Sequence, residues 1–206
     1  PEKLEPTGEH IEIGRAELWC EDSKVVLKRM MMAGRKFDLI LVDPPYGVQR
    51  DVRGLGVMEG DDVGSLWSVG PMSKLLAAGG HLALWTAERT LAQWAQAITL
   101  AGLQIHQVIR WRKPNIPEYI AAEYLIVAGH ASCPRFELIR DTLPNNHPLR
   151  KVHQSPKPPE LMETVINALC PPGGTVADFF AGTCPVGVAA VRLGCTYLGV
   201  EINPKS

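Results

Sequence analysis

The chain has 206 residues, of which 46% are hydrophobic, and a formal net charge of −1. This length and composition predict one globular domain over residues 1–206. No apolar run approaches the ~20 residues of a membrane span and no signal-peptide pattern opens the chain, so we expect a cytoplasmic protein. The five cysteines have no paired metal-ligand spacing, which predicts reduced thiols and no metal site. The net charge excludes an overall basic protein, so any surface for nucleic acid must be local.

The start of the chain predicts a strand followed by a helix. Alternating residues over 11–20 indicate the strand. Asp22 can cap a helix whose apolar residues fall at helical spacing, and Gly34 can end that helix. Residues 1–10 carry little pattern. Because the first residue is proline, we expect the natural protein to begin earlier.

The most informative stretch is a second predicted strand at 37–42 and the residues that follow it. Five of its six residues are apolar, which predicts a strand buried on both faces of a parallel sheet. Pro44 and Pro45 cannot donate to a sheet ladder, so the strand ends at Asp43, on the edge where α/β sheets bind ligands. A fixed carboxylate and a fixed carbonyl can hold an amino group, and the ring of Tyr46 can stack on a nucleobase. A simple turn after a strand is the alternative interpretation.

The middle of the chain continues the alternation of helices and strands. The predicted elements are a helix at 66–78 ended by two glycines, a strand at 81–86, a helix at 88–101, and strands at 104–112 and 123–128. Residues 49–62 are charged and Gly-rich, so they form either a mobile lid or a solvated loop. Residues 129–152 carry four Lys or Arg against two acidic residues, which makes them the best candidate for a small DNA-facing insertion. A solvated loop is the simpler alternative there.

The C-terminal part predicts a nucleotide-binding βαβ unit. A helix through Leu169 precedes a strand at 175–180, a tight turn at 181–183, a helix at 186–193 and a strand at 196–200. A glycine turn lets the backbone approach a ligand, and the helix N-terminus offers unpaired N–H groups. Glu201 follows Gly182 by 19 residues, the spacing of the acid that binds ribose hydroxyls in such units.

Two motifs carry a resemblance to a known family. The segment Asp43-Pro44-Pro45-Tyr46 resembles the catalytic motif of S-adenosylmethionine-dependent amino-methyltransferases, which methylate adenine N6 or cytosine N4 in DNA. Residues 178–187 are similar to the Asp-x-Phe-x-Gly-x-Gly cofactor motif of that family. The catalytic motif comes first, which is the order of the beta class. The resemblance implies an α/β fold with a doubly wound, mostly parallel Rossmann-like sheet, circularly permuted so that the catalytic motif precedes the cofactor motif.

The resemblance also implies an enzyme, a DNA methyltransferase that uses S-adenosyl-L-methionine on a flipped-out base. Asp43 and the Pro44 carbonyl are expected to accept hydrogen bonds from the target amine, and Tyr46 to stack on the base. An Asp at the first motif position favours adenine N6 over cytosine N4. The implied catalytic residues are Asp43, Pro44, Pro45 and Tyr46. DNA is the expected partner, and family members are often homodimers.

A second implied set of residues binds the cofactor. These residues are Asp22, Lys157, Asp178, Phe180, Ala181, Gly182, Thr183 and Glu201. In the family, an Asp at position 22 approaches the adenine, although a helix cap is the simpler interpretation. Lys157 lies in a segment similar to the family's His-Pro-Thr-Gln-Lys-Pro, near the methionine end, where it is expected to neutralise the cofactor's carboxylate.

One departure from the family keeps alternatives open. Cys184 stands where the cofactor motif ends in glycine, and its side chain narrows the backbone's approach to a ligand. A nucleic-acid-binding subunit with little catalysis is therefore one alternative. An RNA amino-methyltransferase is a second alternative, because the same amine-binding motif serves both DNA and RNA substrates. A nicotinamide dehydrogenase is a third, which fits the ribose acid Glu201 but leaves the Asp43 cluster without a purpose. The final helix of the predicted circuit is absent, so we expect a truncated chain.

Overall fold

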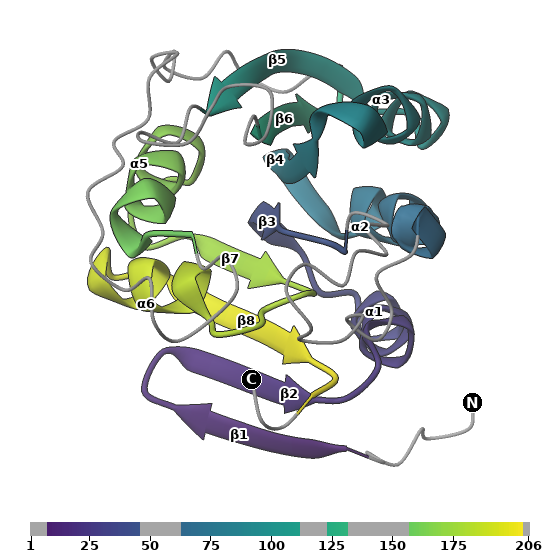
Figure 1. The fold of residues 1–206 in the computed structure, drawn as a ribbon. Coiled ribbons are helices and arrows are strands. Elements are labelled where there is room, and N and C mark those ends of the chain that lie inside the picture. The colour runs from purple at the N-terminus through teal and green to yellow at the C-terminus, as the bar shows by residue number, and fades with distance from the viewer. Residues whose placement is uncertain (1–7, 46–62, 112–122, 132–156, 204–206) are drawn as a thin grey trace, which may run out of the picture.

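The computed structural model describes residues 8–45, 63–111, 123–131 and 157–203. These residues form an eight-stranded sheet in the order β1-β2-β8-β7-β3-β4-β6-β5, with helices on both faces (Figure 1). The strands are β1 (Glu9–Ile13), β2 (Ala16–Cys20), β3 (Phe37–Val42), β4 (Leu76–Ala87), β5 (Gln104–Trp111), β6 (Glu123–Gly129), β7 (Thr175–Asp178) and β8 (Thr196–Glu201). The helices are α1 (Ser23–Met32), α2 (Val69–Leu75), α3 (Leu91–Leu100), α5 (Pro159–Leu169) and α6 (Pro185–Arg192), with 3-10 helices η1 (Val63–Ser68) and η2 (Glu88–Thr90).

The middle of the sheet is parallel and its two edges are antiparallel. Strands β2, β8, β7, β3 and β4 run in one direction. Antiparallel pairs add β1 beside β2, β6 beside β4 and β5 beside β6. The predicted mostly parallel, doubly wound sheet is confirmed, and within it the early strand β2 pairs with the last one, β8.

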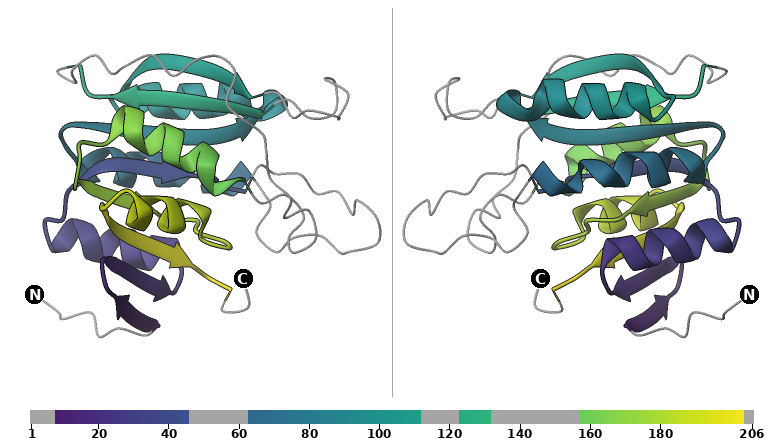
Figure 2. Two further views of the ribbon diagram at one scale, coloured as in Figure 1. Left: turned by 90° about the vertical axis from the view of Figure 1, so that its left-hand side faces the viewer. Right: turned by 90° about the vertical axis from the view of Figure 1, so that its right-hand side faces the viewer.

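Two helical layers cover the sheet, because a parallel strand has to be buried on both faces. Helices α1, α2 and α3 lie over one face, and α5 and α6 lie over the other (Figure 2). Each layer has its own core. Phe37, Trp94 and Phe179 belong to the first core, and Leu41 and Trp85 belong to the second. Successive residues from Leu39 to Val42 therefore enter alternate cores, as the largely apolar strand predicts.

Two predicted elements differ from the structure. The strand predicted at 11–20 is confirmed over Ala16–Cys20, which is β2, but it is broken at Gly14, whose φ is 59°, and Glu9–Ile13 forms a separate antiparallel strand, β1. The helix predicted at 66–78 is wrong at its end, since α2 stops at Leu75 and β4 begins at Leu76. The glycine pair was interpreted as a helix stop, but it lies inside β4. A Cβ on Gly80 would meet the Phe37 carbonyl oxygen at 2.8 Å, so glycine is required there for β4 to approach β3.

Several predicted segments lie outside the described residues. They include Tyr46, the loop at 49–62 and most of the charged segment at 129–152. Within the described part of the chain, no helix is long and apolar enough to cross a membrane. Four of the five cysteines, Cys20, Cys170, Cys184 and Cys195, are free thiols, in agreement with the predicted reduced state.

Candidate active site

The two predicted motifs meet at one edge of the sheet. Strands β3 and β7 are adjacent and parallel, with Leu39 opposite Val176 and Ile40 opposite Ala177. Parallel neighbours end at the same edge, so Asp43 and the turn that contains Gly182 lie side by side there. This convergence of segments far apart in the sequence is what the sequence analysis required of a common site.

Three carboxylates from this edge also share one face. Side chains of a strand alternate between faces, so Asp43 follows Leu39 and Leu41 onto the face covered by α5 and α6. By the same alternation, Asp178 and Glu201 lie on that face of β7 and β8. The charges are close enough to act on one another, since the carboxylates of Asp43 and Glu201 both favour the protonated form of Asp178.

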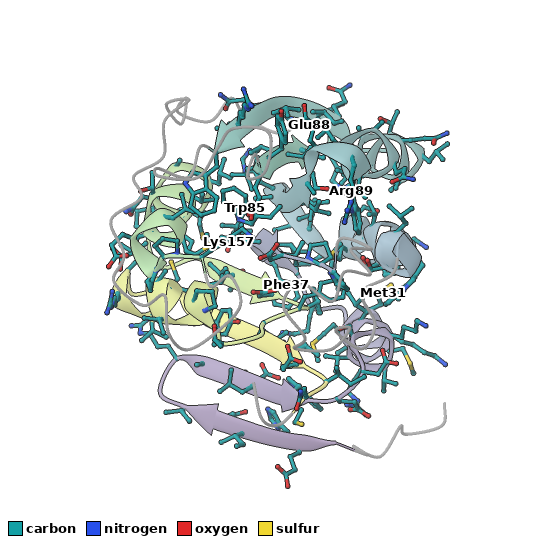
Figure 3. All side chains as sticks on the ribbon, in the orientation of Figure 1. Met31, Phe37, Trp85, Glu88, Arg89 and Lys157 are labelled. Carbon is teal, nitrogen blue, oxygen red and sulfur yellow. The ribbon has the colours of Figure 1, made fainter. Side chains whose placement is uncertain are left out.

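Lys157 links Asp43 to a second carboxylate. Its Nζ donates to Oδ2 of Asp43 and lies 3.2 Å from Oε2 of Glu123. The same Nζ lies 5.1 Å from the centroid of the Trp85 ring, and Figure 3 shows these two side chains together. The Lys157 side chain is 5% exposed, whereas that of Asp43 is 37% exposed. Burial disfavours the ammonium, but the carboxylates of Asp43 and Glu123 outweigh it and raise the pKa of Lys157.

The sequence analysis missed Trp85 and Glu123. Val42 pairs with Leu84, so Trp85 is level with Asp43 on the neighbouring strand. Glu123 pairs with Ala87 across the antiparallel contact between β4 and β6. A signal for Glu123 was present, since it is the single charged residue of a strand that is otherwise apolar apart from Tyr124. Its position beside the site depends on the strand order, which is a tertiary feature.

The glycine turn is closed by Glu201. The Gly182 N–H donates to Oε2 of Glu201 at 2.7 Å, and the Asn203 N–H donates to Oε1 at 2.9 Å. A further bond runs from the Ala181 N–H to the Val200 carbonyl at 2.9 Å. Gly182 has a φ of 50°, and among the described residues, apart from its two chain neighbours, none has an atom within 4 Å of the position that a Cβ would take. The turn therefore has open space beside a half-buried carboxylate.

Asp178 is the most enclosed carboxylate of the group, at 2% exposure. Its Oδ1 accepts a hydrogen bond from the Phe180 N–H at 3.0 Å. Burial, with the nearby Asp43 and Glu201 carboxylates, raises its pKa to about 8, against the lowering effect of that N–H and of Lys157. Asp178 is consequently protonated in the folded protein at neutral pH.

We expect this protonation to make the stability of the protein depend on pH. An unfolded Asp has a pKa of about 3.9, so between about pH 4 and pH 8 the folded state holds a proton that the unfolded state has released. Stability then falls as pH rises through this window. An Asp178→Asn variant keeps the acceptor for Phe180 and has no proton to lose. Thermal unfolding from pH 4.5 to 8.5 should show a steeper decline for the natural protein, and equal slopes would contradict the assignment.

Asp22 serves as the cap of α1. Its side chain accepts a hydrogen bond from the Lys24 N–H at 2.8 Å. The next residue, Ser23, donates from Oγ to the carbonyl of Phe179 at 2.5 Å, which fixes the start of α1 against the end of β7. The simpler interpretation of Asp22 as a helix cap is therefore confirmed, and a role toward a cofactor stays a prediction.

Comparisons with known proteins agree with this geometry. Residues 135–206 match the family N6_N4_Mtase, described as DNA methylase. The fold resembles that of M1.HpyAVI in its SAM complex, with a TM-score of 0.75, 19% identity, and coverage of 92% of this chain and 94% of that one. It also resembles the PvuII DNA methyltransferase (cytosine-N4-specific), with a TM-score of 0.71, 17% identity, and coverage of 93% and 83%. A third resemblance is to TTHA0409 of Thermus thermophilus, complexed with S-adenosyl-L-methionine, with a TM-score of 0.64, 22% identity, and coverage of 94% and 89%. The curated protein sequences contain no match.

These findings support the resemblance to amino-methyltransferases: residues 135–206 match the family model, and the solved structures share the fold. The matched segment spans Lys157, the Gly182 turn and Glu201, while the fold likeness extends over nearly the whole chain. The likeness to these structures also confirms the predicted α/β fold class.

The departure from the family motif at Cys184 has a specific geometry in this chain. Cys184 has left-handed backbone angles, φ 63° and ψ 39°, that glycine adopts at lower cost. Its Sγ donates to the Tyr197 hydroxyl at 3.4 Å, so the thiol is directed between α6 and β8. Burial raises the pKa of Cys184, which keeps it a neutral thiol. The side chain is thus part of the packing beneath the turn.

A substitution at Gly187 tests how closely Cys184 and Tyr197 pack beneath the turn. A Cβ on Gly187 would contact Cys184 Sγ and approach Cε1 of Tyr197 to 2.6 Å, so we expect Gly187→Ala to lower the free energy of unfolding by about 1–3 kcal/mol. Adding Cys184→Gly should recover part of the loss, because it removes one of the two clashes and suits the left-handed angles. The measurement is urea denaturation. Gly70→Ala is the control: it lies in α2 with open space at Cβ, so it meets no comparable clash and should cost less stability than Gly187→Ala, although it precedes Pro71.

Proposed function

We propose that this protein transfers a methyl group from S-adenosyl-L-methionine to the exocyclic amine of a DNA base, with adenine N6 favoured over cytosine N4. In the transfer, a bond forms between the amine nitrogen and the methyl carbon, the bond from that carbon to sulfur breaks with its electron pair left on the sulfur of S-adenosylhomocysteine, and the nitrogen releases a proton to solvent. The base has to leave the duplex first, which costs a few kcal/mol. The observation that carries the proposal is the convergence of Asp43 with the Gly182 turn at one edge of β3 and β7.

On this proposal the chain orients the amine. The Asp43 carboxylate accepts a hydrogen bond from the amino group, and the Pro44 carbonyl accepts a second. These two acceptors turn the nitrogen lone pair out of conjugation with the ring and toward the methyl group. Pro44 and Pro45 restrict the backbone that carries both acceptors, so the acceptors are fixed before the base arrives. Orientation and placed charge then supply the acceleration.

The residues of the turn fit the cofactor. Glu201 offers a carboxylate at the end of β8 as an acceptor for ribose hydroxyls, and Gly182 has open space where a side chain would stand. We assign Asp178, Phe180, Ala181 and Thr183 to the same binding site, with Asp22 at its adenine end. When bound, S-adenosylmethionine supplies an electrophilic methyl group on a sulfonium. The carboxylates of Asp43 and Glu201 place negative charge near that cation.

A transfer assay tests the proposal. The protein is incubated with S-adenosylmethionine labelled with tritium in its methyl group, and with either unmethylated plasmid DNA or total RNA. We expect label in DNA, and digestion followed by mass spectrometry should show N6-methyladenine. Label in N4-methylcytosine would show that the target is cytosine N4 and not adenine N6. Label in RNA alone would favour the RNA amino-methyltransferase, and cofactor binding without any transfer would favour the nucleic-acid-binding subunit.

A further inference from the structure

Three parts of the chain enclose the ammonium group of Lys157. Asp43 comes from the end of β3, Glu123 from the start of β6, and Trp85 from the carboxyl end of β4, while Lys157 itself lies just before α5. Two carboxylates contact the ammonium and an aromatic face lies beside it. The Lys157 side chain is 5% exposed and that of Glu123 is 13% exposed. Such an arrangement holds a charge inside the protein, because each buried charge requires a partner.

This placement differs from the role that the family resemblance implies. A lysine that neutralises the carboxylate of a cofactor needs an ammonium that can reach the ligand. The charge of Lys157 is compensated by two carboxylates within the protein, and little of its side chain is exposed. The exposed member of the group is Asp43, at 37% of its side chain. Of the residues around the ammonium, Asp43 is therefore the one whose carboxylate a ligand can contact.

We propose that Lys157 is a positioning residue that acts through Asp43, and that Glu123 and Trp85 hold its ammonium in place. The ammonium donates a hydrogen bond to Oδ2 of Asp43. This bond fixes the plane of the carboxylate, and therefore the direction from which it accepts a hydrogen bond from the target amine. The Asp43 carboxylate is attached by rotatable bonds to a proline-stiffened backbone, so the bond from the buried ammonium restricts its orientation. This inference rests on the proposed function, since it assigns a role in that reaction.

Two variants separate the positioning role from a loss of folding. Lys157→Met removes the charge but leaves Glu123 buried next to an apolar chain, which is strongly destabilising. The double variant Lys157→Met with Glu123→Gln removes both buried charges together, which proteins tolerate far better. Arg192→Met is the matched control, because it removes a cation from an exposed ion pair with Glu163 between α5 and α6. Circular dichroism and thermal unfolding establish which variants are folded.

Each folded variant is measured in two ways. Calorimetry gives the Kd of S-adenosylhomocysteine, which carries the amino-acid carboxylate, and of 5′-methylthioadenosine, which lacks it. Initial rates of tritium transfer to unmethylated plasmid DNA give kcat and the KM of S-adenosylmethionine. We expect both Kd values and the KM to stay within about threefold of the natural protein, while kcat falls about 100-fold. The Arg192→Met control should match the natural protein in every measurement.

The outcomes discriminate between the possible roles. A variant that loses affinity for S-adenosylhomocysteine but keeps it for 5′-methylthioadenosine would show that Lys157 holds the cofactor's carboxylate, which overturns the inference and leaves the proposed function standing. An unchanged kcat in the folded double variant would also overturn it. If the natural protein binds neither compound and transfers no label, the proposed function fails, and the inference fails with it.

Discussion

An Asp43→Ala variant is expected to lose about 1,000-fold in kcat while its affinity for S-adenosylhomocysteine stays close to that of the natural protein. Under the proposed function, Asp43 contacts the amine and the cofactor motif lies on the neighbouring strand, so binding and transfer are separable. Removing one placed group that stabilises developing charge typically costs 10²–10³ in kcat. A 1,000-fold loss corresponds to about 4 kcal/mol of transition-state stabilisation. Single-turnover tritium transfer and calorimetry measure the two quantities.

A second substitution at the same position serves as the control. Asp43→Asn retains the shape of the side chain and one carbonyl oxygen but removes the negative charge that pairs with Lys157. We expect it to transfer methyl groups more slowly than the natural protein and faster than Asp43→Ala. Transfer by Asp43→Ala at more than a tenth of the natural rate would rule out the assigned role of the carboxylate.

The largest effect on stability is expected from Phe179→Ala. Phe179 is fully buried, and its ring packs edge to face against Phe37 with 6.1 Å between ring centroids. Truncating a buried phenylalanine removes apolar contacts and leaves a cavity, which typically costs 3–5 kcal/mol. Because single domains are stable by only about 5–15 kcal/mol, this variant should unfold at a markedly lower urea concentration.

The neighbouring residue provides the contrast. Phe180 is only partly buried, beside the first core, and its N–H donates to Asp178 through the backbone, which an alanine would preserve. We expect Phe180→Ala to cost about 1 kcal/mol or less in stability. Under the proposed function its effect falls on cofactor affinity instead. Equal losses of stability from Phe179→Ala and Phe180→Ala would contradict the interpretation that Phe179 belongs to the core and Phe180 to the cofactor site.

The sequence was sufficient to predict the elements at the site. The apolar run before Asp43 indicated a parallel strand, and the prolines after it fixed where that strand ends. The spacing from Gly182 to Glu201 indicated the βαβ unit. These signals are local, since they depend on periodicity and on the conformational limits of glycine and proline.

The surroundings of Lys157 could not be predicted in the same way. The position of Glu123 beside Asp43 depends on β6 running antiparallel to β4, and no local pattern fixes that order. The glycine pair before His81 was misinterpreted for a related reason. Glycine marks both the end of a helix and a close approach of two strands, and only the position of β3 distinguishes the two.

The close contact at Gly80 has a consequence for how activity is tuned. Gly80 lies near the start of β4, and Trp85, roughly 17 Å further along the same strand at the usual rise of a strand, lies beside the Lys157 ammonium that contacts Asp43. A larger residue at position 80 would meet the Phe37 carbonyl oxygen and force β4 to shift away from β3 at that point. Under the proposed function, the alignment of Asp43 is therefore sensitive to a buried glycine toward the opposite end of β4. Substitutions confined to the predicted site residues would not test this dependence.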